Sequence, residues 1–258
     1  MAEHAGKGFI WYELMTTDVE AARTFYSNVV GWQTRDSGMP GMRYELFGMD
    51  GKDVGGMMSM PDPAEHKAMW MAHIYTPDVD AAAAAVTERG GSILRPPTDI
   101  PHVGRFAVVR DPQSAVYLLF QPGGGGVWEP LGAQAVGNIG WHELVTTDWE
   151  AAWEFYSGLY GWTKHMAVDM GPMGTYQTFM STDTQGGGMM TMPPPMQAAG
   201  APPHWTYYLT VDSIQAAKQR VLDAGGKVTH EPSEVPGGAW ILQGIDPQGA
   251  RFALTAKS

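Results

Sequence analysis

Two side chains that could move a proton, Glu13 and His73, stand at matching positions of a repeated pattern. The segment Trp11–Asp18 ends in Thr-Thr-Asp, and the segment Met71–Asp78, 60 residues later, ends in Thr-Pro-Asp. If both segments are strands that lead into helices, Glu13 and His73 are equivalent and can meet in a pair of related modules. A carboxylate beside an imidazole can shuttle protons near neutral pH. The pattern therefore predicts Glu13 and His73 as candidate catalytic residues.

The second half of the chain repeats this pair with one change. Glu143 takes the place of Glu13, and Tyr208 takes the place of His73. Both His and Tyr can donate a hydrogen bond to a carboxylate. The glutamates are therefore also interpreted as internal struts that hydrogen-bond the opposite sheet, a role that needs no chemistry. Both interpretations stay open at this point.

The elements that would position these residues belong to a tandem duplication. Trp11–Trp32 returns as Trp141–Trp162, with 14 of 22 positions identical. Each copy predicts a short strand, then a helix with apolar residues at helical spacing that ends at a glycine. The Thr-Asp-x-Glu pattern at Thr17 and Thr147 indicates a capping box, in which the Thr hydroxyl and the Glu carboxylate satisfy backbone N–H groups.

A weaker repeat inside each half divides the chain into four units of one strand, one helix and three strands. Gly-Gly-Met-Met-x-Met-Pro begins at Gly55 and again at Gly187, and Asp-Pro-Gln occurs at Asp111 and Asp246. Further strands are expected near 44–47, 54–60, 70–75, 115–120 and 250–255. We predict two domains, 1–122 (modules about 8–61 and 68–121) and 138–258 (modules about 138–193 and 203–256), joined by a Gly-rich linker, 123–137. Pro193–Pro203 is expected to be a second connector.

The Asp…Phe-Tyr…Gly-Trp pattern at Asp18 and Asp148, with the Gly-Gly and Asp-Pro-Gln signals, resembles the vicinal oxygen chelate superfamily. That superfamily includes glyoxalase I, bleomycin-resistance proteins and extradiol dioxygenases. The resemblance implies an α+β fold of four βαβββ modules, paired into two glyoxalase-like domains whose curled mixed sheets form cups. It also implies a divalent metal in the cup, held by one residue from each module's first strand and one from each module's last.

This chain departs from the family pattern at the metal positions. The first-strand ligand positions hold Trp11, Met71, Trp141 and Thr206, and the last-strand positions hold Leu118 and Ala253 or fall near Gly56–Met58 and Gly188–Met190. His142 lies one residue from such a position, and strand alternation should turn it to the other face. Indole, thioether and alkyl groups do not make a cage for a hard cation. We therefore predict no metal site and no cofactor, with a divalent metal as the alternative that the family implies.

The same positions predict an apolar wall with a few polar groups, the usual form of a small-molecule site. The predicted ligand-binding residues are Trp11, Met58, Met71, Phe120, Trp141, Glu143, Met190 and Tyr208. The first hypothesis is a metal-independent protein that binds a small apolar or aromatic molecule. The alternatives are a metal-dependent lyase or dioxygenase of the superfamily, and a metal-free acid–base enzyme that uses Glu13 and His73.

Composition limits the partners. The 258-residue chain has a net charge of −11 and no cysteine. An acidic chain without a basic cluster lacks the footprint that nucleic acid requires, and the missing thiols exclude disulfides and Cys-ligated metals. No apolar run predicts a membrane span or a signal peptide, so we expect a cytoplasmic protein. Since one chain contains four modules, we expect a monomer or a weak homodimer.

Overall fold

A computed structural model gives an α+β fold with two eight-stranded mixed sheets. It describes residues 8–39, 41–62, 67–123 and 131–257. The strand order is β2-β3-β4-β1-β5-β8-β7-β6 in one sheet and β10-β11-β12-β9-β13-β16-β15-β14 in the other. Each half of the chain repeats the order of the other, which confirms the predicted fold class of βαβββ modules.

The element bounds repeat from module to module. The first module holds β1 (Phe9–Thr16), α1 (Val19–Val30), β2 (Gln33–Asp36), β3 (Tyr44–Met49) and β4 (Lys52–Ser59). The second holds β5 (Met69–Tyr75), α2 (Val79–Glu88), β6 (Ser92–Ile100), β7 (Gly104–Arg110) and β8 (Val116–Pro122). The third holds β9 (Ile139–Thr146), α3 (Trp149–Tyr160), β10 (Thr163–Asp169), β11 (Thr175–Met180) and β12 (Gly186–Thr191), with a 3₁₀ turn at Gly171–Met173. The fourth holds β13 (His204–Thr210), α5 (Ile214–Asp223), β14 (Lys227–Glu234), β15 (Trp240–Ile245) and β16 (Arg251–Ala256).

The first helix of each half begins at an aspartate. Asp18 and Asp148 are the N-cap residues, and their side chains accept hydrogen bonds from the backbone N–H groups of Ala21 and Ala151. The predicted capping box was therefore wrong by one residue, because Asp is as good an N-cap as Thr and stands next to it. Gly31 ends α1 at φ 91°, in the left-handed region where glycine carries no steric cost.

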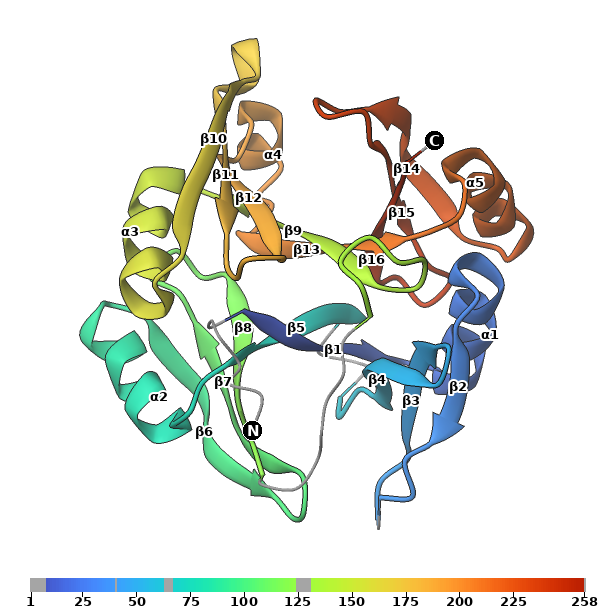
Figure 1. Ribbon diagram of the computed structural model, residues 1–258, viewed down its shortest axis with the longest axis horizontal. Coiled ribbons are helices and arrows are strands. Elements are labelled where there is room, and N and C mark those ends of the chain that lie inside the picture. The colour runs from blue at the N-terminus through green and yellow to red at the C-terminus, as the bar shows by residue number, and fades with distance from the viewer. Residues whose placement is uncertain (1–7, 40, 63–66, 124–130, 258) are drawn as a thin grey trace. The chain divides into compact units, whose positions relative to one another are not determined.

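Dense packing divides the chain into two compact units: unit 1 is built mainly from the second and third modules, and unit 2 mainly from the first and fourth. Unit 1 comprises residues 1–10, 72–128 and 141–205, and unit 2 comprises 11–71, 129–140 and 206–258. In unit 1 α2 packs on α3, and in unit 2 α1 packs on α5 (Figure 1). The predicted domain boundaries at 122 and 138 stay a prediction.

A buried Tyr–Asp–Trp cluster joins the two modules of unit 2. The hydroxyl of Tyr26 on α1 donates to Asp246 Oδ2 at 3.0 Å and accepts from Trp70 Nε1 at 3.0 Å. Asp246 also accepts from the backbone N–H groups of Gln248 and Ala250, at 2.9 and 2.8 Å. Burial, followed by the charge of Asp246, raises the pKa of the Tyr26 hydroxyl, so this proton stays in place.

Unit 1 contains the same cluster with different chain segments. Tyr156 on α3 donates to Asp111 Oδ2 at 3.1 Å and accepts from Trp205 Nε1 at 3.1 Å. Asp111 is 3 % exposed and accepts from the N–H groups of Gln113 and Ala115. The Asp-Pro-Gln signal in the sequence is therefore a turn whose aspartate anchors the tyrosine of a helix from another module.

The two predicted connectors differ in how much of each the structure describes and in what it contains. Most of the predicted linker 123–137 lies outside the described residues, although Gly137 accepts a hydrogen bond from Trp32 Nε1 at 2.7 Å. The second connector contains a short helix, α4 (Pro194–Ala198), which was not expected because its N-cap residue and its first two residues are all proline. Proline is tolerated in the first turn of a helix, where its missing N–H has no intrahelical role. Among the described residues, no helix is both long enough and apolar enough to cross a membrane.

Candidate functional site

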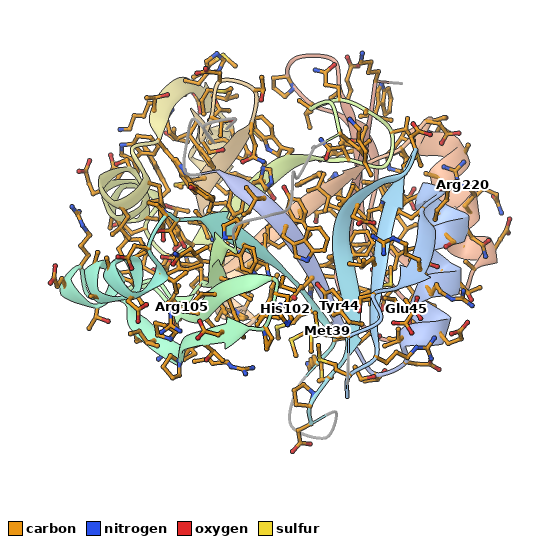
Figure 2. The ribbon with its side chains drawn as sticks, turned by 60° about the horizontal axis from the view of Figure 1, so that its bottom comes forward. Met39, Tyr44, Glu45, His102, Arg105 and Arg220 are labelled. Carbon is orange, nitrogen blue, oxygen red and sulfur yellow. The ribbon has the colours of Figure 1, made fainter. Side chains whose placement is uncertain are left out.

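In unit 2, three side chains of one sheet face form a hydrogen-bonded relay. Trp11 Nε1 on β1 donates to the hydroxyl of Tyr44 on β3 at 2.7 Å, and that hydroxyl donates to Glu13 Oε1 at 3.1 Å. Trp11 and Glu13 are two residues apart and therefore lie on one face of β1. Tyr44 and Glu45 follow one another on β3 and take opposite faces (Figure 2). We call this set the Trp–Tyr–Glu relay.

Unit 1 contains a second relay with nearly the same geometry. Trp141 Nε1 on β9 donates to the hydroxyl of Tyr176 on β11 at 2.8 Å, and that hydroxyl donates to Glu143 Oε2 at 3.1 Å. The tryptophan and glutamate of both relays are half-buried. An aromatic plane and a carboxylate are thus presented together on each face.

A glycine makes room for the tyrosine of each relay. Gly56 on β4 pairs with Glu13 on β1. A Cβ built on Gly56 would lie 2.2 Å from Cζ and 2.3 Å from the hydroxyl oxygen of Tyr44. Gly188 on β12 pairs with Glu143, and its Cβ would lie 2.2 Å from Cζ of Tyr176. Side-chain atoms cannot approach that closely, so the relay requires glycine at both positions.

The opposite face of β1 and β9 is core. Tyr12 and Leu14 are 3 % and 0 % exposed, while Trp11 and Glu13 on the other face are half-buried. His142 is 0 % exposed, its ring stacks on Phe9 with centroids 4.2 Å apart, and its Nδ1 lies 3.0 Å from the carbonyl oxygen of Gly186. This confirms that His142 points away from the face of Trp141. Burial lowers its pKa to about 4, so the ring is neutral at pH 7.

The surroundings of the Tyr44 hydroxyl in the first relay shift its pKa. Burial, followed by the charge of Glu13, raises the pKa of the Tyr44 hydroxyl well above its usual value. The phenol therefore stays protonated at physiological pH and donates to Glu13, while the Trp11 indole supplies the hydrogen bond that the phenol oxygen accepts. The relay thus fixes the direction of both hydrogen bonds.

Comparison with known proteins places this fold in a family. The model of the Glyoxalase/Bleomycin resistance protein/Dioxygenase superfamily matches residues 8–115 and 138–254. The chain belongs to this superfamily. "Putative glyoxylase CFP32" of Mycobacterium tuberculosis is 32% identical over 251 residues, which cover 95% of this chain and 92% of that protein. "Anthracycline biosynthesis protein DnrV" of Streptomyces peucetius is 31% identical and covers 95% of this chain and 91% of its own length.

Solved structures of the superfamily share the architecture. The Mn(II)-bound glyoxalase from Novosphingobium aromaticivorans superposes with a TM-score of 0.66 at 16% identity, covering 98% of this chain and 83% of its own. The 2,3-dioxygenase LapB from Pseudomonas sp. KL28 gives 0.66 at 12% identity, covering 99% and 93%. These likenesses show the fold and leave the activity to be argued from the site.

The structure shows the surroundings of the positions to which the resemblance assigns metal ligands. The Trp11 indole is a hydrogen-bond donor to Tyr44, and Gly56 lies under the ring of Tyr44. On the last strands, Leu118 and Ala253 are 2 % and 0 % exposed and have no donor atom in the side chain. Within the described ranges, no three His, Asp or Glu residues are grouped closely enough to hold an ion. The donors at these positions do not fit a divalent cation.

The structure also gives the positions of the remaining predicted catalytic and ligand-binding residues. Met58 and Met190 are half-buried and pair with Met15 and Val145 on the neighbouring strands of their sheets. In unit 1 the buried ring of His73 on β5 meets Phe120 on β8 edge to face, with centroids 5.5 Å apart.

Met71 and Tyr208 belong to unit 2. Met71 is 7 % exposed. Tyr208 is 2 % exposed and accepts a hydrogen bond from Gln243 Nε2 at 3.0 Å. The pairing of Glu13 with His73, and the roles of all these side chains as catalytic or ligand-binding groups, stay predictions.

Sequence reasoning missed the two tyrosines at the centre of the relays. The signal was present, because Tyr44 and Phe47 recur 132 residues later as Tyr176 and Phe179, as Gly56 recurs as Gly188. A tyrosine and a glycine that recur at the same offset indicate a ring packed on a backbone. Glu13 and Glu143 each accept a hydrogen bond from a tyrosine of their own module, and the predicted bond to the opposite sheet stays a prediction.

Proposed function

We propose that this protein binds small planar apolar or aromatic molecules on the two faces that carry the Trp–Tyr–Glu relays, without a resident metal. The observation that supports the proposal is the relay itself, in which Trp11 and Trp141, at positions where the resemblance expects metal ligands, each donate a hydrogen bond to a tyrosine. Each half-buried indole offers a flat apolar surface, and the carboxylate beside it can accept a hydrogen bond from a ligand hydroxyl.

Methionine and glycine on the neighbouring strand suit the same kind of ligand. Met58 lies two residues from Gly56 on β4, on the same face, and is half-buried. Its thioether is flexible and polarizable and packs well against aromatic rings. An apolar wall with a few fixed polar groups is the usual composition of a small-molecule site.

The name of one relative agrees with this ligand class. DnrV is a protein of anthracycline biosynthesis, and anthracyclines are planar polycyclic aromatic compounds. The chain is 31% identical to it over almost its whole length. A hydroxylated polycyclic aromatic is therefore the first class of ligand to test.

The test is a thermal-shift titration of chelator-treated protein with 1,4-dihydroxyanthraquinone. Binding to the native state raises the melting temperature with ligand concentration. We expect stabilisation of the wild type, and loss of most of it in the double variant Trp11→Ala/Trp141→Ala. Trp149→Phe removes a tryptophan on α3 outside the relays and should leave the shift unchanged. Absence of a shift in the wild type, or an equal shift in the double variant, contradicts the proposal.

An enzymatic function is the second candidate, because the relative CFP32 is named a glyoxylase. It would be a metal-dependent lyase or dioxygenase, or a metal-free acid–base enzyme that uses Glu13 and His73. Elemental analysis of protein purified without chelators tests the first form, which requires near-stoichiometric Mn, Fe, Ni or Zn. Glu13→Gln tests the second form, because it should abolish turnover of a hemithioacetal while melting is unchanged.

A further inference from the structure

Three neighbouring strands of unit 1, β6, β7 and β8, present a half-buried apolar surface. Phe106 and Val108 alternate on β7 with two residues that are fully buried, so they lie on the face of the strand opposite the core. Phe120 on β8 is the direct cross-strand partner of Phe106. Its ring lies over Gly104, where a Cβ would be 2.8 Å from Cζ of the ring. Phe106, Val108 and Phe120 are all half-buried, so part of each side chain stays accessible.

Arg95 on β6 extends over this apolar surface. It pairs with Val108, and the register of β6 shifts on both sides of it, as in a bulge that redirects a side chain. Its Cζ lies 4.8 Å from the centroid of the Phe106 ring, which holds one face of the planar guanidinium by a cation–π contact. The N–H donors lie at the edge of that plane. We call Arg95, Phe106, Val108 and Phe120 the Arg95 face.

The charges on the two faces of β7 differ. On the core side, Arg105 donates to Asp80 Oδ2 at 2.8 Å and to Asp99 Oδ1 at 2.7 Å, so two carboxylates neutralise it. On the other side, Arg110 donates to the uncharged Ser92 hydroxyl at 3.1 Å. Arg95 is exposed, and among the residues that the structure describes no carboxylate pairs with it. The positive charge on this side of the sheet therefore favours an anion.

Unit 2 lacks this arrangement at the equivalent place. The residues that its register aligns with Arg95, Val108 and Phe106 are His230, Gln243 and Ile241. His230 Nε2 lies 2.8 Å from the Ser233 hydroxyl, and Gln243 Nε2 donates to the Tyr208 hydroxyl at 3.0 Å. These polar groups bond one another, and neither a guanidinium nor an aromatic ring stands there. The Arg95 face thus belongs to one unit only.

We propose that the Arg95 face is a binding site for a small carboxylic acid that carries an aromatic ring. The carboxylate accepts two parallel hydrogen bonds from the planar guanidinium of Arg95. Phe106, beneath the guanidinium, and Phe120 are partners on strands roughly 4.8 Å apart. A ring joined to the carboxylate by one or two methylene groups therefore reaches Phe120 and packs on it and on Val108. The site shares no residue with the relays, so its test does not depend on the function proposed for them.

The experiment is an NMR titration of ¹⁵N-labelled full-length protein with 3-phenylpropionate and with its neutral analogue 3-phenylpropanamide. We expect saturable shifts of the amide signals of Arg95, Val108 and Phe120 with the carboxylate. The amide should bind about fivefold more weakly, because an exposed ion pair contributes up to about this factor. Absence of saturable shifts at these residues overturns the proposal. Equal affinity for the amide overturns the assignment to a carboxylate.

Two single variants with the same change in charge test the role of the guanidinium. Arg95→Gln should weaken 3-phenylpropionate binding about fivefold and leave 3-phenylpropanamide binding within about twofold. Arg251→Gln, at an exposed arginine of β16 in unit 2, is the control and should leave both affinities within about twofold, because salt screens a distant surface charge. Unchanged affinity in Arg95→Gln, or an equal loss in Arg251→Gln, contradicts the site.

The relay variant separates this site from the relay faces. In Trp11→Ala/Trp141→Ala, the shifts of Val108 and Phe120 with 3-phenylpropionate should persist at unchanged affinity. Their persistence supports the Arg95 face even if dihydroxyanthraquinone does not bind the wild type. Their loss in this variant would assign the carboxylate to the relay faces and overturn the proposal.

Discussion

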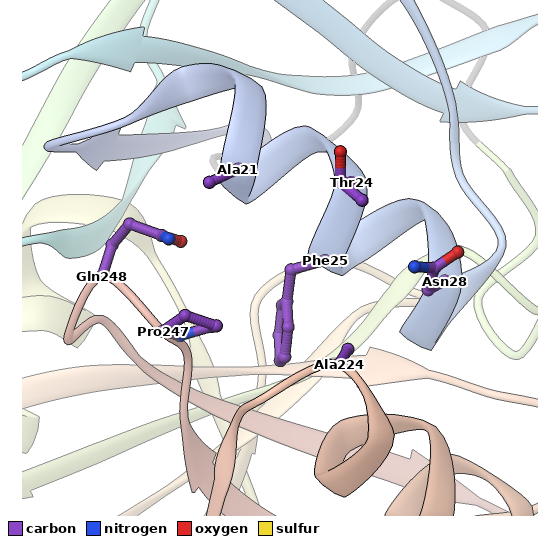
Figure 3. Close-up of a pocket in the computed structure, with 7 residues that line it drawn as sticks. All are labelled: Ala21, Thr24, Phe25, Asn28, Ala224, Pro247 and Gln248. Carbon is purple, nitrogen blue, oxygen red and sulfur yellow. The ribbon is translucent and has the colours of Figure 1, made fainter.

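Units 1 and 2 keep the same internal hydrogen bonds and differ at their surfaces. Both contain a Trp–Tyr–Glu relay on one sheet face, and both contain a buried tyrosine held between an aspartate and a tryptophan. In unit 1 the Arg89 guanidinium lies against Gly158 on α3, whereas in unit 2 the equivalent residues Ala224 and Asn28 line an open groove of about 320 Å³, the outer groove (Figure 3). The fully buried position beside the relay tryptophan is His142 in unit 1 and Tyr12 in unit 2.

This comparison of the two units indicates which contacts can diverge after a duplication and which cannot. The tyrosine of each relay bonds two side chains on the first strand of its module, and Gly56 or Gly188 must stay small beneath its ring, so one substitution disturbs three strands. A groove filled by one exposed side chain can be emptied by replacing that side chain alone. Such grooves can therefore differ between the units, while the relay faces should behave alike.

The largest effect is expected at the buried aspartates. Asp111→Ala and Asp246→Ala each leave a tyrosine hydroxyl and two backbone N–H groups without their acceptor. Each should lower the free energy of unfolding by about 3 to 4 kcal/mol. Urea denaturation measures both, and the two values should agree within about 1 kcal/mol. A large loss in one unit only would break the structural equivalence of the clusters.

The free energy of unfolding should depend on acid pH through His142, which unit 1 has and unit 2 replaces with Tyr12. Its pKa is lowered to about 4 in the folded protein, below the usual 6.5, so the unfolded chain binds more protons between these values. Stability contributed by the neutral ring is present above pH 6.5 and is lost as the pH falls toward 4, by at most about 3 kcal/mol.

The variant His142→Phe removes this titration. Its free energy of unfolding, measured by urea denaturation from pH 4 to pH 7, should lose less on acidification than that of the wild type. Any cost of leaving the Gly186 carbonyl without its partner is independent of pH in this range. Parallel curves for the two proteins would show that His142 is not responsible for acid sensitivity.

Removing the relay hydroxyls should have a smaller effect on stability and a clear effect on binding. Tyr44→Phe and Tyr176→Phe each delete one acceptor for an indole N–H and one donor to a carboxylate. Each should cost about 1 to 2 kcal/mol, measured by thermal unfolding. If the relay faces are equivalent, each variant should also weaken dihydroxyanthraquinone binding at one of two sites. Loss of all binding in one variant would assign the ligand to one unit.

The smallest effect is expected from filling the open groove. Ala224→Arg/Asn28→Gly adds a contact of the kind that Arg89 makes with Gly158, but it also puts a glycine into α1. Gly in a helix costs about 0.5 to 1 kcal/mol, and a cation at a helix C-terminus recovers a similar amount. Stability should therefore stay within about 0.5 kcal/mol of the wild type in a melting experiment. A loss of several kcal/mol would show that the groove cannot hold an arginine.

The fold could be predicted from the sequence because it is encoded by local signals that occur in duplicate. The Asp before each first helix and the Gly after it set the helix bounds, and the repeated strands follow at fixed offsets. The α4 helix escaped prediction because a run of prolines usually marks an irregular connector.

The candidate site was predicted less completely. Alternation places Trp11 and Glu13 on one face of β1, but it cannot show that Tyr44, 31 residues beyond Glu13, reaches both of them. The pairing of modules within each compact unit is also a long-range property. The hydrogen bond from Tyr26 to Asp246 spans 220 residues, and nothing near either residue in the sequence specifies the other.

The central claim is that the relay faces bind a planar aromatic ligand without a metal. Isothermal titration of chelator-treated protein with 1,4-dihydroxyanthraquinone, before and after Mn²⁺ is added, tests it most directly. We predict saturable binding to the chelated protein at two sites per chain, unchanged by Mn²⁺ and lost in Trp11→Ala/Trp141→Ala. Binding that appears only after Mn²⁺ is added, or that survives in the double variant, would contradict the account.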